Sequence, residues 1–436
     1  MVCSGIVLYI LHKQFNRPYF PVNQQLIPTS LSLLTKIPLN QRFYALDVFR
    51  GATVALMILV NNPGSWAHIF APLEHAPWHG CTPTDLVFPF FLFAVGNALA
   101  FVMPRLQTAG TNAFLKKVIT RTLLIFAIGL FLNWSPFIKW SNGELVFKYW
   151  VDPENPTTGI RILGVLQRIA LSYFFASICI YFLKIRGALI TSVIVLFVYW
   201  LLCAVLGTPG DPYSLAGYFG TGWDKSILGI PHMYKGEGVP FDPEGISSTL
   251  TSIVQVIFGY VAGNYIRNYV KTTDNKEVAI YKTLTNLFVA AALLIAAGFL
   301  WDLAFPINKK IWTSSYLLYT TGLACMVLGV LIYLIECRHW KGAWSRFFDV
   351  FGKNALFIFF LSGFLPRVLA MFRWTDHLNE KGEPVYTSAF PWFYQHICKP
   401  VAENLKIGSL LYALCMITFY WLIVYWMDKK KIYIKV

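Results

Sequence analysis

Apolar stretches of about 20 residues recur along the whole of this 436-residue chain, and they constrain its fold more than any other feature. A helix of that length crosses roughly 30 Å of hydrocarbon and satisfies its own backbone hydrogen bonds where no water is present. Only 13% of the residues are charged, whereas about a quarter are charged in an average soluble domain. We therefore expect an all-α polytopic membrane protein, held in a lipid bilayer by about ten transmembrane helices. The expected helices cover residues 46–62, 84–104, 118–134, 161–183, 187–207, 247–268, 284–301, 311–335, 347–367 and 407–427.

The loops between the expected helices alternate in charge. Lys and Arg are retained on the cytoplasmic side of a membrane more often than they are translocated. Basic residues collect before the first expected helix, in every second loop and after the last helix, whereas loop 63–83 has none and loop 208–246 is mainly acidic. We therefore expect both termini to lie in the cytoplasm and these two loops to face outward. The same topology explains the net charge of +15, so no nucleic-acid partner is needed.

The chain divides at residue 42. The apolar run within residues 1–41 is too short to cross a bilayer, so this N-terminal segment has no assigned role. Residues 42–436 form the expected transmembrane domain. The eight cysteines show no CxxC or metal-ligand spacing, and we expect no metal. Cys81 and Cys398 both fall on the outer side, where a disulfide is chemically allowed, and whether they pair stays open.

Polar side chains inside an apolar helix, or at its ends, are the first candidates for function. Asp47 and Arg50 lie three residues apart on one helix face, where they form an interfacial ion pair or hold an anionic ligand. Asn61 and Asn62 end the first expected helix, and an amide there caps the helix or orients a substrate. Arg168 is surrounded by apolar residues, so its charge needs a protein partner, a lipid headgroup or a ligand phosphate.

The outer loop 63–83 concentrates side chains that carry protons or stack on sugars. Asp85 follows the loop, which contains His68, His75, His79, Trp66 and Trp78. Histidine takes and returns a proton near neutral pH, and a nearby carboxylate fixes its tautomer. His75 and His79 are four residues apart, but the intervening Pro77 disfavours the helix that a shared metal would require. The loop is therefore either an acid/base site, with Trp78 as a stacking face, or a non-catalytic loop whose tryptophans anchor it at the interface.

A pair of carboxylates precedes the expected helix 247–268. Asp242 and Glu244 lie in the turn-like sequence FDPEG, and the helix dipole favours acids at a helix N-terminus. Capping accounts for one of these acids. The functional alternative is that they bind a cationic acceptor such as an amino sugar.

Five motifs follow one another along the expected transmembrane domain: RFYALDVFRG at 42–51, HAPWHGCTPTDLVFPFFLFAVG at 75–96, GVLQRIALSYF at 164–174, FDPEGISSTLTSIV at 241–254 and INKKIWTSSY at 307–316. In this order they resemble the heparan-α-glucosaminide N-acetyltransferase family, the transmembrane acetyltransferases of the lysosome and their bacterial relatives. The resemblance implies transfer of an acetyl group from cytoplasmic acetyl-CoA to the amino group of a terminal glucosamine across the membrane. It implies that His75 is the active-site histidine and that Asn61, or else Asn62, is the active-site asparagine. The pocket expected around the sugar comprises Asp85, Trp78, Asp242 and Glu244.

The implied reaction fits these residue types. An ammonium must lose a proton before its nitrogen attacks a thioester, and a neutral His75 accepts that proton. Asn61 either donates a hydrogen bond to the developing oxyanion or orients the acceptor. We favour direct transfer in a ternary complex over an acetyl-His75 intermediate. We expect the phosphates of CoA to be bound by basic residues, namely Arg50, Arg168, Arg105, Lys117 and Arg121. The alternative explanation for the cytoplasmic basic residues is the positive-inside rule alone.

Two other functions stay open. One is O-acetylation of a glycan, which keeps the acetyl donor and changes the acceptor. The other is a transporter for sugars or muropeptides, although such sites lie near the membrane midplane and the polar cluster here lies at the outer end. Since this sequence lacks the long luminal N-terminal region of the lysosomal enzyme and differs from it at His79, we expect a protein of the bacterial inner (cytoplasmic) membrane with His75 on the periplasmic side. The oligomeric state, a homodimer included, stays open.

Overall fold

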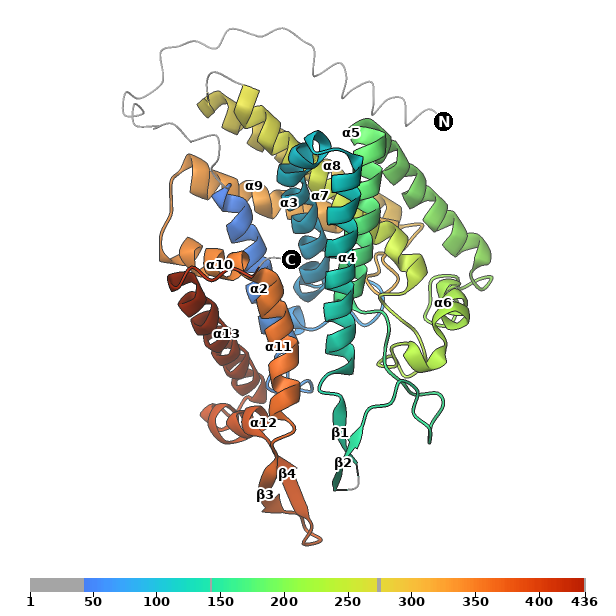
Figure 1. The fold of residues 1–436 in the computed structure, drawn as a ribbon, viewed down its shortest axis with the longest axis vertical. Helices are drawn as coiled ribbons and strands as arrows, with labels where there is room; N and C mark the ends of the chain where they lie inside the picture. The colour runs from blue at the N-terminus through green and yellow to red at the C-terminus, as the bar shows by residue number, and fades with distance from the viewer. Residues whose placement is uncertain (1–42, 142, 273–275, 435–436) are drawn as a thin grey trace. The chain divides into compact units, whose positions relative to one another are not determined.

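The computed structural model describes residues 43–141, 143–272 and 276–434. The expected segment 1–41 lies outside them. One compact unit begins at Tyr44 and runs to the end of the chain. In chain order (Figure 1), its elements are α2 (Tyr44–Asn61), η1 (Ala71–Leu73), η2 (Pro83–Leu86), α3 (Val87–Thr108), α4 (Thr111–Trp134), β1 (Ile138–Ser141), β2 (Glu144–Phe147), α5 (Val165–Leu206), α6 (Gly220–Leu228), η3 (Ile230–His232), α7 (Ile246–Thr272), α8 (Lys276–Asp302), α9 (Ser314–Ile332), η4 (Tyr333–Cys337), α10 (Ala343–Lys353), α11 (Ala355–Leu369), β3 (Trp374–Leu378), β4 (Pro384–Thr387), α12 (Ala389–Phe393), η5 (Tyr394–Cys398), η6 (Lys399–Val401) and α13 (Leu405–Lys429).

The described residues are mostly helical, as the apolar pattern predicts. The strands among them form two short antiparallel hairpins, β1–β2 and β3–β4. In the described part of the chain, seven helices are long and apolar enough to cross a membrane, or eight if the bent pair α10–α11 counts as one span. These helices indicate an integral membrane protein. The expected total of ten stays a prediction.

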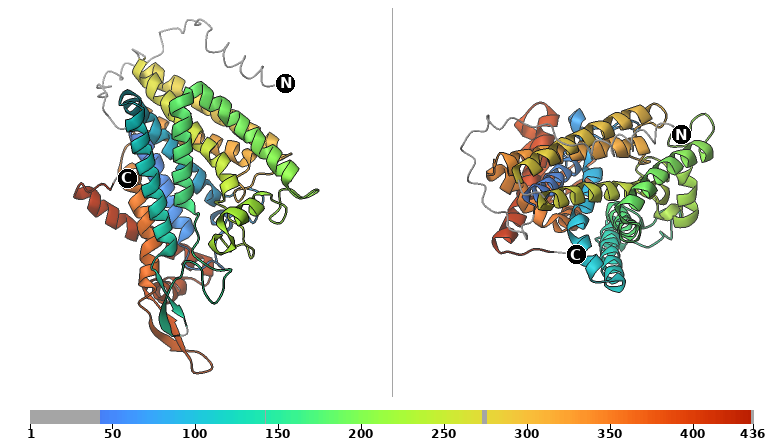
Figure 2. Two further views of the ribbon diagram at one scale, coloured as in Figure 1. Left: turned by 45° about the vertical axis from the view of Figure 1, so that its right-hand side comes forward. Right: turned by 90° about the horizontal axis from the view of Figure 1, so that it is seen from above.

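Two expected helices form the two halves of α5. The structure runs them together over 42 residues, with a break at Lys184, where φ is 58°. From this break the halves diverge as the arms of an inverted V (Figures 1 and 2). The expected helix 118–134 lies within α4, which is not one of the seven helices that are long and apolar enough to cross a membrane.

The expected helix 347–367 is broken instead of continuous. Its two parts, α10 and α11, meet at Asn354 with a bend of 76°. The buried Asn354 amide donates to the Ile432 carbonyl at 3.1 Å, and its oxygen accepts from the Ile434 N–H at 2.9 Å. In the sequence, Asp349, Gly352, Lys353 and Asn354 interrupt the apolar residues of this segment. They do not reveal the bend itself, because it depends on contacts of Asn354 with the C-terminal residues.

The connections gather at two ends of the helical unit. The α3–α4 turn and the break in α5 lie at one end, whereas both hairpins, α6 and α12 lie toward the other (Figure 1). The first end carries the basic residues Arg105, Lys184 and Arg186, as the charge alternation predicts. The membrane side that each end faces stays a prediction.

Close helix contacts fix the position of α3 against α7. A Cβ at Gly96 would lie 2.0 Å from the Val256 carbonyl oxygen, and one at Gly259 would lie 2.2 Å from the Phe93 carbonyl oxygen. Glycine allows two backbones to approach this closely, as is common between membrane helices. The contact brings the start of α3, which carries Asp85 just before it, to the same end as the start of α7.

We expect Gly96→Ala to destabilise the protein by about 1–3 kcal/mol, because its methyl group would overlap backbone atoms of α7. Thermal unfolding in detergent measures the change. Gly363→Ala is the control, since its Cβ would lie 3.8 Å from the nearest atom, which belongs to the Leu132 side chain. Equal melting temperatures for the two variants would contradict this account of the α3–α7 contact.

Candidate active site

His75 and Asp85 are held together by the loop between them. Asp85 is 1% exposed, and its Oδ2 accepts the backbone N–H groups of Ala76 and Thr82, each at 3.0 Å. Its Oδ1 accepts the Nδ1–H of His75 at 2.7 Å. Thr82 and Asp85 cap the short helix η2 reciprocally, which fixes the carboxylate before α3 begins. With Nδ1 carrying the proton, the Nε2 of His75 is the basic nitrogen.

Lys309 completes this cluster, and the sequence analysis did not single it out. Its Nζ lies 3.3 Å from Asp85 Oδ1 and 3.1 Å from His75 Nδ1. Loop 63–83 reaches this lysine because the Gly80 N–H donates to the Ile307 carbonyl at 2.7 Å, with Gly80 at a φ of 101° that favours glycine. Burial lowers the pKa of Lys309, while Asp85 opposes that shift. The only signal in the sequence was its place in the INKKIWTSSY motif.

The acidic pair before α7 is bound by Arg161, a second residue that the sequence analysis missed. Arg161 donates to both carboxylate oxygens of Asp242, at 2.6 and 3.1 Å, and also to Glu244. Asp242 further accepts the backbone N–H groups of Tyr234 and Glu244. Burial would raise the pKa of Glu244, but the guanidinium groups of Arg161 and Arg168 hold it below its usual value. Asp242 is thus saturated by protein groups, whereas the Glu244 side chain keeps 12% exposure.

Neither of these two acids caps α7 at its first residue. The Ile246 N–H instead donates to the buried carboxylate of Asp224, on α6, at 2.9 Å. The sequence analysis expected Asp242 or Glu244 to cap this helix. The structure uses Asp224 for the Ile246 N–H instead, a residue 22 positions earlier in the chain.

Arg168 is 1% exposed and lies beside the acidic pair. It donates to the Ser248 hydroxyl and to the Gly245 carbonyl, the latter at 3.4 Å. Its guanidinium carbon is 5.0 Å from the centre of the Trp312 ring and 6.0 Å from that of Phe88. The partner that the sequence required is therefore a set of protein groups at the end that holds loop 63–83.

The residues expected to hold CoA phosphates do not form one cluster. Arg50 donates to Asp47 Oδ1 and to the Gly352 carbonyl, both at 2.7 Å, so it joins α2 to α10. Arg105 and Lys117 are exposed near the α3–α4 turn. Arg121 places its guanidinium 4.9 Å from the centre of the Tyr173 ring. Arg168 lies apart from these residues, next to Gly245 and Ser248.

Trp78, also in loop 63–83, packs against residues that precede the acidic pair Asp242 and Glu244 in the chain. Its indole N–H donates to the Tyr213 carbonyl at 2.8 Å, and its ring centre lies 5.6 Å from that of Phe241. The Lys310 ammonium lies 5.6 Å from the centre of the same ring. These three contacts hold the indole of loop 63–83 in place.

The two asparagines at the end of α2 have different surroundings. The Asn62 amide donates to the Ile58 carbonyl at 2.9 Å and so satisfies the last turn of the helix. Asn61 is exposed. The chain after them runs toward α13, where the Gly64 N–H donates to the Ser409 carbonyl at 3.3 Å. The hydrogen bonds of the described residues therefore link His75 to Asp85 but do not link it to Asn61.

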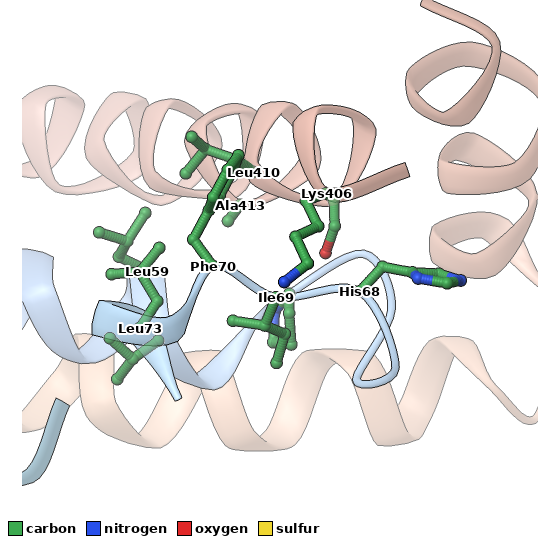
Figure 3. Close-up of a pocket in the computed structure, with 11 residues that line it drawn as sticks. Leu59, His68, Ile69, Phe70, Leu73, Lys406, Leu410 and Ala413 are labelled. Atoms are coloured by element: carbon green, nitrogen blue, oxygen red, sulfur yellow. The ribbon is translucent and has the colours of Figure 1, made fainter. Parts of the chain in front are cut away.

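A small pocket between α2, the loop after it and α13 is separate from the His75 cluster. Its walls are mainly apolar, with Lys406 at one side, and neither His75 nor Asp85 lines it. In Figure 3 the His68 ring points away from the apolar side chains. His68 lines this pocket, whereas His75 does not.

The cysteines named in the sequence analysis are not paired in the described part of the chain. Cys81 and Cys398 are free thiols, and burial raises the pKa of Cys81 to about 12. Among the residues that the structure describes, no group of three or more His, Cys, Asp and Glu side chains is arranged to hold a metal ion.

Removing Arg161 should destabilise the protein strongly, because it would leave Asp242 buried without its counter-charge. We expect Arg161→Ala to lower the free energy of unfolding by about 3–5 kcal/mol. Thermal or denaturant unfolding in detergent tests this. Lys139→Ala is the control, since its pair with Asp152 is exposed and should contribute about 1 kcal/mol or less. A loss no larger than that of the control would exclude a structural role for the Arg161 cluster.

Comparisons with known proteins agree with the motifs. A family model described as "Heparan-alpha-glucosaminide N-acetyltransferase, catalytic" matches residues 42–217. Human heparan-alpha-glucosaminide N-acetyltransferase is 29% identical over 377 residues, which cover 74% of this chain and 52% of the human protein. The mouse protein of the same name is 27% identical over 374 residues, covering 73% of this chain and 53% of its own. This chain thus spans about half the length of these curated proteins, and over about three quarters of its own length it is similar to the heparan-alpha-glucosaminide N-acetyltransferases.

Proposed function

We propose that this protein is a membrane acetyltransferase that moves an acetyl group from acetyl-CoA to the amino group of a glucosamine-type sugar. The observation that carries the proposal is the His75–Asp85 pair, with Nδ1 bonded at 2.7 Å to a buried carboxylate and a side chain that is 41% exposed. This arrangement leaves Nε2 free to take a proton from an incoming acceptor. The two relatives support the acetyl donor and the amino-sugar acceptor by their names.

The reaction proceeds by attack of the sugar amine on the thioester carbonyl carbon. The sugar ammonium first loses one proton to give the free amine. A nitrogen–carbon bond then forms, His75 Nε2 takes the second proton of the attacking nitrogen, and the carbon–sulfur bond breaks. CoA leaves as a thiolate that is then protonated, so the balance is one amide, one thiol and one released proton. We favour this direct transfer over an acetyl-His75 intermediate.

The acceptor is proposed to approach from the end of the molecule that holds loop 63–83. His75, Lys309, Arg161 and Glu244 all keep partial exposure there. Glu244 is better placed than Asp242 to meet an ammonium group, because Asp242 is fully enclosed by Arg161 and backbone donors. Trp78 offers an apolar face for a sugar ring, and Asn61 is assigned to orient the acceptor.

The donor is proposed to enter from the opposite, cytoplasmic end. Arg105, Lys117 and Arg121 near the α3–α4 turn supply positive charge for the CoA phosphates. Arg50 is a weaker candidate, since it is bonded to Asp47 and Gly352. In this topology His75 faces the extracytoplasmic side, of a bacterial inner membrane in our proposal.

A glycan O-acetyltransferase and a sugar transporter are the competing functions. A hydroxyl acceptor would use the same His75–Asp85 pair, so only substrate comparison separates it. A transporter would move glucosamine without consuming acetyl-CoA.

Loss of His75 should abolish acetyl transfer while leaving the fold intact. We expect His75→Ala to lower the turnover number by about 10²–10⁴-fold, the usual contribution of a general base. The measurement is transfer of radiolabel from acetyl-CoA to glucosamine by purified protein in proteoliposomes. His68→Ala is the matched control, because His68 comes from the same loop and lines a pocket that His75 does not line. Transfer by the His75 variant at the wild-type rate would refute the proposed role of His75; bound acetyl-CoA without transfer by the wild type would indicate another acceptor.

Asp85→Asn should reduce turnover by about 10²-fold or more, since a neutral amide no longer holds the Nδ1–H tautomer of His75 or balances Lys309. The initial rate at saturating acetyl-CoA checks this. Glu74→Gln, which removes an exposed acid of the same loop, should leave the rate unchanged. Similar rates for both variants would show that Asp85 does not position His75.

A further inference from the structure

Two N–H donors buried beside the His75–Asp85 pair have no hydrogen-bond partner. They are the indole Nε1–H of Trp312 and the Nε–H of Arg168, and both side chains are 1% exposed. Among the described residues, nothing accepts from either atom. An unpaired N–H in a membrane interior is costly, and an unpaired part of a guanidinium is more so. Buried donors that the fold itself does not use suggest a ligand acceptor.

The two donors belong to one place in the fold. The guanidinium carbon of Arg168 lies 5.0 Å from the centre of the Trp312 ring. Phe88, three residues after Asp85, places its ring 5.0 Å from that of Trp312. Tyr316 packs its ring 5.3 Å from Trp312 and donates its hydroxyl to the Asp85 carbonyl at 2.6 Å. The donors therefore lie one layer of side chains away from the residue that holds His75.

The backbone at Trp312 is strained. Its φ is 49°, in the left-handed region that a residue with a bulky side chain seldom adopts. The Trp312 N–H donates to the Lys309 carbonyl at 3.1 Å, and its carbonyl accepts from the Thr251 hydroxyl at 2.7 Å. The same turn thus directs Lys309 toward His75 and the indole toward Arg168. Strain of this kind is typical of functional sites, where it holds a side chain in one orientation.

The two donors suit an oxygen that carries little charge before reaction better than a phosphate. The guanidinium of Arg168 lies close enough to Glu244 to lower the pKa of that carboxyl, together with Arg161, so part of its positive charge is already balanced. The charge that remains would balance a doubly charged phosphate less well than a single negative charge that develops during the reaction. The carbonyl oxygen of a thioester is neutral in the ground state and becomes negative only as the carbonyl carbon is attacked.

We propose that Trp312 Nε1–H and Arg168 Nε–H bind the carbonyl oxygen of the acetyl thioester and stabilise its negative charge during transfer. This inference rests on the acetyl transfer proposed above. As the sugar nitrogen bonds to the carbonyl carbon, the π electrons move onto the oxygen between the two donors. They return when the carbon–sulfur bond breaks and CoA leaves as the thiolate, while His75 Nε2 keeps the amine proton. Asn61 then retains the task of orienting the acceptor.

Trp312→Phe tests the proposal because it removes one N–H and keeps an aromatic ring. We expect kcat to fall by about 10²–10³-fold, with KM for acetyl-CoA changed by about threefold or less. Trp344→Phe is the matched control: its indole Nε1 is also buried without a partner, but it lies on α10. The control should keep wild-type kcat. A Trp312→Phe enzyme with kcat within about threefold of wild type would overturn the assignment.

A measurement on the wild-type protein avoids dependence on the variant's folding. In isotope-edited infrared spectra, the thioester carbonyl of bound [1-¹³C]acetyl-CoA should absorb at a lower frequency than in water, because two donors polarise it. An unshifted or raised frequency would overturn the proposal. If the wild type transfers no acetyl group to any amine, the proposed function fails; if it transfers normally with an unshifted carbonyl, only the assignment of Trp312 and Arg168 fails.

Discussion

The end of the protein that holds loop 63–83 is organised by the need to satisfy one buried carboxylate. Asp85 lies at the start of a membrane helix, where water cannot solvate its charge. Two backbone N–H groups occupy one of its oxygens, while His75 and Lys309 contact the other. These donors come from loop 63–83 and from the segment before α9. Satisfying Asp85 therefore fixes the tautomer of His75 and joins two segments that are distant in the sequence.

A second set of buried charges follows the same principle and lies at the start of α7. Arg161 bonds to both Asp242 and Glu244, and Arg168, which lies beside them and near two aromatic rings, supplies the second positive charge. The close α3–α7 contact, made possible by Gly96 and Gly259, brings these charges to the same end as Asp85. The proposed base His75, the proposed sugar-binding acid Glu244 and the unpaired donors of Trp312 and Arg168 therefore lie toward one end of the helical unit. In surroundings of low polarity a fixed donor stabilises developing charge more than it does in water.

Sequence reasoning found the parts of the site that are local. His75 and Asp85 are ten residues apart around one short loop, so their proximity was predictable from spacing and residue type. Arg161 and Lys309 were missed because nothing near them in the sequence marks either residue as paired. Arg161 begins an expected helix, Lys309 is one of two adjacent lysines, and the acid or histidine that each contacts lies 81 or more residues away. Arg168 was recognised as needing a partner, but an isolated sequence does not distinguish a phosphate from Ser248, Gly245 and Trp312. The break at Asn354 was missed because the side chain of Asn354 bonds to Ile432 and Ile434, which lie 78 and 80 residues later in the chain.

The sequence by itself determined the all-α membrane class, the approximate positions of the helices and the motifs of the acetyltransferase relatives. These properties follow from hydropathy and local residue order, which act over one helix or one loop. Only the tertiary structure decided which charges are neutralised within the protein and which donors remain unpaired. That outcome depends on contacts between helices far apart in the chain, because each buried polar group must find its partner in three dimensions.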